Sequence, residues 1–172
     1  DPVMLSLDDY YIDRDRIPRD TNGEMDLEHI NTLDIPRFNG DLALLLDGCE
    51  AEIPLFNFKT GKREKQGKVL KLHRDQPLII EGIHALNDDL GGAHPEAFKI
   101  YLSARSNMMD GSETVFKGTW IRLTRRSVRD MNFRGSDVTT TFALWANVRR
   151  GEKLYISPYK YRANLILDTA LP

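Results

Sequence analysis

Two carboxylates that follow short apolar runs could work together at one site. Asp8 comes after the run at residues 3–7, and Glu81 follows the run at residues 78–80. Neither run alternates apolar and polar residues, which is typical of parallel strands buried on both faces. Because ligands bind at the carboxyl ends of strands in open α/β sheets, the two acids predict a site at that edge. The alternative is a pair of solvated strand-end acids without a function.

A predicted helix over residues 119–133 carries arginines on one side. Side chains advance about 100° per residue, so one arc holds Arg122, Arg125, Arg126 and Arg129. The opposite side is apolar, is expected to be core, and holds Trp120, Leu123, Val128 and Met131. Like charges at i,i+4 destabilise a helix, and few acids lie nearby in the sequence, so a bound polyanion would relieve them. Arginine binds phosphate oxygens bidentately, which favours phosphate over the alternative of solvated surface charges.

A second helix is expected directly after this one. Gly135 ends the arginine helix, and Ser136 or Asp137 caps the next. The second helix has an apolar stripe that we expect to be buried, made of Val138, Phe142 and Trp145. Two helices with arginines on one side would behave as a helical lid.

The rest of the pattern predicts an α/β fold with a parallel sheet flanked by helices. A helix is expected over residues 38–46, ending at Gly48. Runs at residues 53–58 and 69–72 flank a turn at residues 60–62 and predict a small β-hairpin. Further elements are strands over residues 98–102 and 165–167 and a long polar loop over residues 13–26.

Composition excludes several classes of protein. The 172 residues carry a net charge of −2, which gives no electrostatic reason to expect nucleic acid or an anionic membrane. With one cysteine, Cys49, no disulfide framework forms, so we expect a cytoplasmic protein. No stretch approaches the roughly 20 apolar residues of a membrane span. The four histidines lack metal-ligand spacing and are expected to be non-ligands.

Several segments resemble the uridine kinase and phosphoribulokinase family, in the order in which that family carries them. They are SLDDYY at 6–11, IPLFNF at 53–58, IEGIH at 80–84, and RLTRR at 122–126 followed by Arg129 and Asp130. The later segment WANVRRGE, at 145–152, is similar to the bacterial uridine-kinase-like branch. The resemblance implies one domain over residues 1–172 with a P-loop kinase fold. It also implies transfer of the γ-phosphoryl group of ATP to a hydroxyl, typically the 5′-hydroxyl of a pyrimidine nucleoside.

The resemblance implies roles for individual residues. Asp8 would accept the proton of the attacking hydroxyl, while Glu81 would hold Mg²⁺ through water. Arg122 and Arg125 would contact the transferring phosphates, and Arg126 and Arg129 would bind ATP. The acceptor would be bound by Tyr11, Glu28, Phe56, Phe58, Arg63 and Ile83, with Glu28 on the ribose hydroxyls. Plain core packing is the alternative for Phe56 and Phe58. Asp9 is expected to point elsewhere, and Tyr10 to be structural.

Two departures from the family pattern affect the expected function. The sequence has no G-x-x-x-x-G-K-[ST] loop to cradle phosphates, and Gly61 stands where nucleoside-specific members commonly place a base-reading histidine. We expect a fragment that lacks the first strand and phosphate loop, and is inactive alone; a degenerate relative is the alternative. The function is then a nucleoside kinase domain or a non-catalytic module that binds phosphate or a partner. The expected partner is a nucleoside acceptor, with no nucleic acid or membrane, and homo-oligomerisation is left open.

Overall fold

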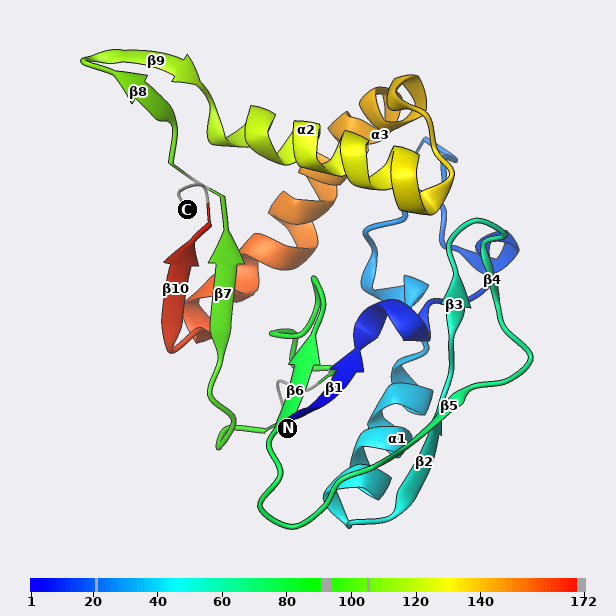
Figure 1. The fold of residues 1–172 in the computed structure, drawn as a ribbon. Helices are drawn as coiled ribbons and strands as arrows, with labels where there is room; N and C mark the ends of the chain where they lie inside the picture. The colour runs from blue at the N-terminus through cyan, green and yellow to red at the C-terminus, as the bar shows by residue number, and fades with distance from the viewer. Residues whose placement is uncertain (21, 91–93, 105, 170–172) are drawn as a thin grey trace.

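The parallel strands form two separate pairs, with helices packed around them (Figure 1). The computed structural model describes residues 1–20, 22–90, 94–104 and 106–169. Strand β1 (Val3–Ser6) pairs with β6 (Leu78–Glu81), and β7 (Ile100–Ser103) pairs with β10 (Leu165–Asp168). Within these residues no strand joins the two pairs by hydrogen bonds. The expected α/β class, with parallel strands and flanking helices, is confirmed.

The predicted hairpin is present in two antiparallel parts. Strand β2 (Glu50–Ile53) pairs with β5 (Lys68–Lys71). Nearer the turn, β3 (Phe56–Asn57) pairs with β4 (Lys62–Arg63). A second hairpin, which the sequence analysis did not predict, joins β8 (Met108–Asp110) to β9 (Glu113–Phe116) and projects from the body as an arm (Figure 1).

Several ends of the α-helices coincide with a capping residue or a left-handed glycine. Helix α1 (Ile35–Leu46) starts at Asp34, whose side chain accepts a hydrogen bond from the Arg37 amide, and the left-handed Gly48 follows its end. Helix α2 (Gly118–Arg129) continues as the π-helical turn η5 (Asp130–Arg134) until Gly135, with φ 69°. The side chain of Asp137 caps α3 (Val138–Gly151).

Shorter helical turns connect these elements. Three lie early in the chain: η1 (Leu7–Tyr10), η2 (Arg14–Arg16) and η3 (Ile30–Thr32). Two follow α3, namely the π-helical η6 (Glu152–Ile156) and the 3₁₀-helical η7 (Ser157–Arg162). None of the described helices is long and apolar enough to cross a membrane.

The core lies where α1 packs against β1, η1 and β2. Its fully buried members include Leu5, Tyr10, Phe38, Leu45 and Ile53. The expectation that the parallel strands are buried on both faces is wrong. Met4 and Ile79 are 48% and 43% exposed, whereas Leu5 is 0% exposed. An apolar run indicates that a strand favours burial. In this pair the side that carries Leu5 is buried in the core with α1, and the side that carries Met4 and Ile79 is partly exposed.

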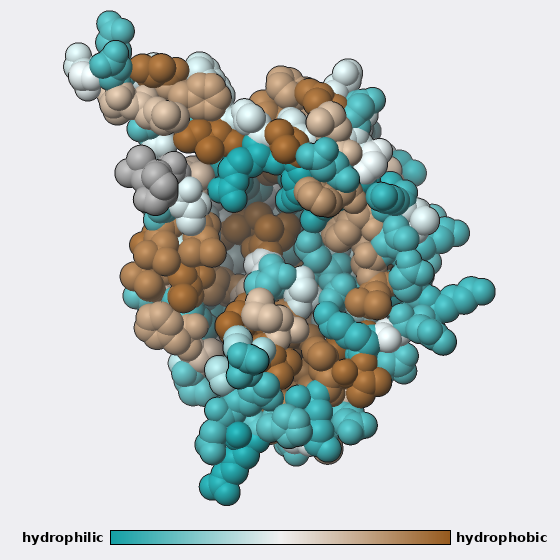
Figure 2. Space-filling model, viewed as in Figure 1, coloured by the Kyte–Doolittle hydropathy of each residue, from teal (hydrophilic) through white to brown (hydrophobic). Residues whose placement is uncertain are grey.

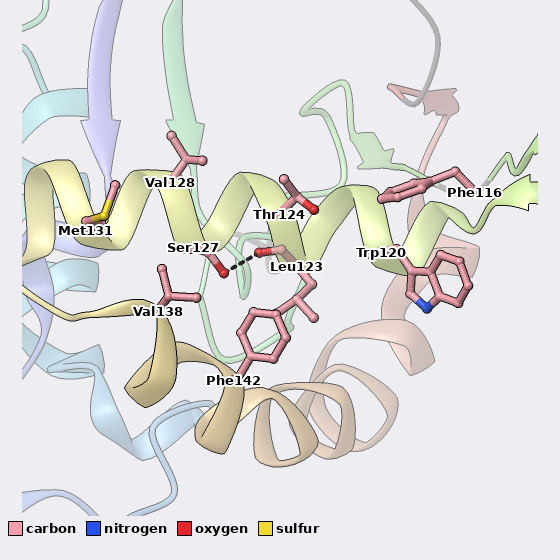
Figure 3. Close-up of a pocket in the computed structure, with 9 residues that line it drawn as sticks. All are labelled: Phe116, Trp120, Leu123, Thr124, Ser127, Val128, Met131, Val138 and Phe142. Carbon is pink, nitrogen blue, oxygen red and sulfur yellow. Dashed lines mark hydrogen bonds between the residues drawn. The ribbon is translucent and has the colours of Figure 1, made fainter.

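The apolar side of α2 is not core either. Trp120, Val128 and Met131 are 46–55% exposed, as are Val138 and Phe142 of α3 at 43% and 56%. Together with neighbouring residues they line an open groove of about 460 Å³ between α2 and α3 (Figure 3). Helical periodicity predicted the apolar sides of both helices correctly. It could not show whether another element covers them.

Candidate active site

The register of the first parallel pair brings the two predicted acids to one edge. Ser6, the last residue of β1, lies opposite Glu81, the last residue of β6. The Ser6 hydroxyl donates a hydrogen bond to the Glu81 carboxylate and accepts one from the backbone N–H of Asp8 at 3.3 Å. Asp8 follows in the 3₁₀ turn η1. One serine therefore links the strand ends that carry both carboxylates.

Asp8 forms an ion pair with an arginine from the far end of the lid. Nη2 of Arg134 donates to Oδ2 of Asp8 at 2.9 Å. Burial raises the pKa of Asp8, the charge of Arg134 opposes that rise, and the nearby Glu81 carboxylate adds to it. A carboxylate with a raised pKa is a better proton acceptor than an ordinary aspartate, while the arginine keeps it oriented.

The two residues after Asp8 point away from it and anchor the turn. Asp9 accepts a hydrogen bond from Nζ of Lys68 at 2.9 Å. Tyr10 is fully buried, donates its hydroxyl proton to Asp41 at 3.1 Å, and meets the ring of Phe38 edge-on. Three successive positions therefore carry one candidate site acid, one acid paired with Lys68 and one core aromatic residue.

Three aromatic rings gather beside Asp8. The ring of Tyr11 lies 5.5 Å from that of Phe56 and 5.9 Å from that of Phe58, and the two phenylalanine rings are 5.2 Å apart. The guanidinium of Arg134 lies 4.0 Å from the Phe58 ring centroid. All three rings keep some exposure, so they form a wall as well as a packed cluster. We call Tyr11, Phe56 and Phe58 the aromatic wall.

Glu28 approaches the site from the loop after β1. Its side chain is buried and lies 3.5 Å from Nη1 of Arg126. Burial raises the pKa of Glu28, and the Arg126 charge opposes that rise. Burial also raises the pKa of the Tyr11 hydroxyl, with the Asp8 and Glu28 charges contributing. The predicted acceptor residues Tyr11 and Glu28 thus share one electrostatic environment with Asp8.

The loop that carries Glu28 is tied to the lid. Nη2 of Arg150, on α3, lies 3.0 Å from Asp20 and 3.5 Å from Asp26. The hydroxyl of Tyr155 donates to Asp26 at 3.0 Å. Two acids of the loop therefore meet side chains from the helix and from the π turn η6. The predicted long loop is therefore bound to α3 and to the turn that follows it.

The expectation that few acids relieve the arginine face is wrong. Arg122 pairs with Glu152 at 2.6 Å and Arg129 with Asp130 at 2.7 Å. Arg126 lies 3.4 Å from Asp130 in addition to its contact with Glu28. Most of these acids come from distant segments or from the next helical turn, so a local reading of the sequence missed them. Arg125 is exposed and forms no ion pair with any described residue.

Arg63 is the clearest departure from the predicted set of acceptor-binding residues. Its Nε and Nη2 donate to the backbone oxygens of Tyr11 and Tyr10 at 3.0 Å, and Nη1 donates to Asp34 at 2.9 Å. These bonds occupy the guanidinium, which therefore holds the Tyr11 backbone in place. Ile83 follows Glu81 on the same strand end and is 42% exposed.

Arg134 is the site residue that the sequence analysis missed. In a regular α-helix it would lie outside the arc of the other four arginines, because each residue adds about 100°. The π-helical turn Asp130–Arg134 changes that phase just before Gly135 ends the helix. In the sequence, the position of Arg134 directly before the helix-ending Gly135 was the signal that could have drawn attention to it. The contact between its guanidinium and Asp8 is visible only in the structure.

The oxygen atoms at this edge fit a magnesium ion. Mg²⁺ in phosphoryl-transfer sites is usually held by one or two carboxylates, water and substrate phosphates. Glu81 and Asp8, with the Ser6 hydroxyl between them, supply such donors. Among the described residues no group of three or more His, Cys, Asp or Glu side chains could hold a metal alone. The molecule is hollowed beside this edge, beneath α2 and between the two strand pairs (Figure 2).

Comparison with known proteins agrees with this geometry. The sequence model of the Phosphoribulokinase / Uridine kinase family matches residues 6–171. A uridine kinase of Alkaliphilus metalliredigens (strain QYMF) is 26% identical over 166 residues, which cover 96% of this chain and 72% of that protein. A uridine kinase of Lactobacillus helveticus (strain DPC 4571) is 25% identical over 167 residues, covering 96% and 71%. A carboxylate pair at the strand ends, an arginine-bearing lid and a match along nearly the whole chain lead to one conclusion: the chain belongs to the phosphoribulokinase and uridine kinase family.

Proposed function

We propose that this chain is the acceptor-binding and lid part of a nucleoside kinase that transfers the γ-phosphoryl group of ATP to a sugar hydroxyl. The observation that carries the proposal is Asp8, which lies beside Glu81, next to the aromatic wall, and 2.9 Å from Arg134. Family membership supports kinase chemistry in general. The names of the relatives support a nucleoside as acceptor.

Asp8 has the environment of a general base. Phosphoryl transfer proceeds through a loose transition state, so orienting the hydroxyl contributes more than removing its proton early. The Ser6 contact and the Arg134 ion pair fix the carboxylate, and burial raises its pKa. The nucleoside would lie against the aromatic wall with its ribose near Glu28. Arg134 would then lie close to the phosphoryl group being transferred.

Two groups that this family uses would complete the site. Glu81, aided by Asp8, would hold Mg²⁺, whose charge would neutralise the phosphate oxygens. The exposed Arg125 and Arg129 are the arginines of α2 best placed to receive ATP phosphates, because the side chains of Arg122 and Arg126 are less exposed. The sequence contains no phosphate-binding loop of its own. We therefore propose that phosphoryl transfer needs such a loop in addition to these 172 residues.

Calorimetry with uridine and 5′-deoxyuridine tests the acceptor site directly. The chain should bind uridine. The deoxy compound should bind more weakly, because it lacks the hydroxyl that would donate a hydrogen bond to Asp8. Asp8→Asn should reduce the difference between the two ligands. Equal binding of both by the wild type would contradict this placement. A companion assay with ATP, Mg²⁺ and uridine should show no turnover by this chain alone. Rates near the usual kinase range of about 1–100 s⁻¹ would contradict the need for a phosphate loop.

A further inference from the structure

The turn of the hairpin near the aromatic wall contains a glycine whose side-chain space is filled from another segment. Gly61 has φ +69°, a left-handed conformation that glycine adopts without strain. A β-carbon there would lie 2.6 Å from Cδ of Arg14 and 2.9 Å from its Nε. The side chain of Arg14 therefore crosses the turn where a side chain of residue 61 would lie.

Two hydrogen bonds hold Arg14 in this position. Its backbone N–H donates to the oxygen of Gly61 at 3.0 Å, and its Nη2 donates to the oxygen of Phe58 at 3.0 Å. Phe58 also carries the ring under Arg134. Phe58 of the aromatic wall is therefore contacted by two arginines: Arg134 at its ring and Arg14 at its backbone oxygen.

Arg14 retains donors that the protein does not use. Its side chain is exposed, no described carboxylate pairs with it, and no described residue accepts a hydrogen bond from its Nε or Nη1. An arginine side chain donates hydrogen bonds and cannot accept them. It therefore complements a carbonyl oxygen, whereas an amino group on the same ring carbon would place donor against donor.

Building on the function proposed above, we propose that Arg14 reads the ring edge of the acceptor. A nucleoside with its hydroxyl at Asp8 and its ring on the aromatic wall extends toward the hairpin turn, where Arg14 lies. Arg14 then favours a base with a carbonyl oxygen at that edge, as in uracil, over a base with an amino group there, as in cytosine. Specificity is supplied by the segment after β1 and not by the hairpin residue at position 61.

The test is calorimetric titration of the chain with uridine and with cytidine. The wild type should bind uridine about tenfold more tightly, the scale of one hydrogen bond to a charged group. Arg14→Ala should bring the ratio of the two dissociation constants close to one, mainly by weakening uridine. Arg16→Ala, an exposed arginine in the same turn η2, is the matched control and should keep the wild-type ratio.

A second pair of variants tests the same contact from the glycine side. Gly61→Ala places a methyl group against Arg14 and should lower the selectivity as Arg14→Ala does. Gly111→Ala is its control, because Gly111 also has positive φ, +57°, but a β-carbon added there would have no atom within 4 Å. It should keep the wild-type ratio.

The outcomes separate the two proposals. Equal binding of uridine and cytidine by the wild type, or an unchanged ratio in Arg14→Ala, overturns the role of Arg14 and leaves the nucleoside site standing. If the wild type binds neither nucleoside, the proposed function fails and the role of Arg14 fails with it.

Discussion

Arg134 and Asp8, 126 positions apart in the sequence, form an ion pair 2.9 Å long at the carboxyl end of β1. The pair joins the end of the lid to the first strand and lies over the aromatic wall, since the same guanidinium contacts the Phe58 ring. Displacement of Arg134 would therefore change the charge next to the candidate base.

Asp8→Asn should lower kcat by about 10²- to 10⁴-fold, the usual contribution of a positioned general base. Asparagine keeps the shape but loses the charge and basicity, so the fall in kcat should be much larger than the weakening of nucleoside binding. Asp9→Asn is the matched control, because Asp9 pairs with Lys68 and points away. Steady-state kinetics on a catalytically active polypeptide containing this sequence measures the effect. A larger loss from Asp9→Asn than from Asp8→Asn would show that the assignment is wrong.

Arg134→Gln should raise the pKa of the Asp8 carboxyl further. Burial already raises that pKa and the Arg134 charge holds it down, so removing the charge leaves burial less opposed. Carboxyl NMR titration of the chain measures the shift. Arg125→Gln, which removes an exposed arginine of the same lid, should leave the Asp8 titration nearly unchanged.

The sign of the associated change in stability follows from linkage. An acid whose folded-state pKa is raised stabilises the fold below its unfolded value, and that contribution is lost as pH rises through the folded pKa. Removing Arg134 extends this loss to higher pH. Urea unfolding should therefore show that the variant loses stability relative to wild type as pH rises above the ordinary aspartate range. A difference independent of pH would argue against the ion pair.

Gly151→Ala should destabilise the fold by about 1–3 kcal/mol, the usual cost of overpacking. Its β-carbon would lie 2.2 Å from Cβ of Glu28, in a buried position where α3 meets the loop that carries Glu28. Gly40→Ala is the matched helical control, since no atom lies within 4 Å there. It should stabilise by about 0.5–1 kcal/mol. Urea unfolding measures both, and a neutral Gly151→Ala would contradict the close contact.

Inorganic phosphate or a nucleoside triphosphate should raise the thermal midpoint of the chain by mass action. The exposed Arg125 and Arg129 are expected to supply most of this effect, so Arg125→Ala with Arg129→Ala should remove it. Arg122→Ala should keep most of the ligand-induced shift, because the side chain of Arg122 is less exposed than that of Arg129. Thermal unfolding with and without ligand decides between them. Equal shifts in the wild type and the double variant would exclude the arginine face as the binding site.

The local sequence pattern was sufficient to predict those helices, turns and helix ends that neighbouring residues in the sequence determine. The helix over α1, the hairpin, and the helix ends at Gly48 and Gly135 follow from periodicity and from residues that tolerate left-handed backbone. The placement of Asp8 and Glu81 at one edge could also be predicted, because both follow apolar strands of one parallel pair. The sequence therefore determined the fold class and the acidic character of the strand edge that carries the candidate site.

Tertiary structure decided which charges meet and which apolar faces are covered. Arg134 reaches Asp8 from the π turn that follows α2, and Arg63 is occupied by the backbone of Tyr10 and Tyr11. Arg14 fills the space over Gly61 because two segments distant in sequence pack together. Periodicity specifies the direction of a side chain relative to its own element. It does not specify the partner, since the partner is set by packing between elements.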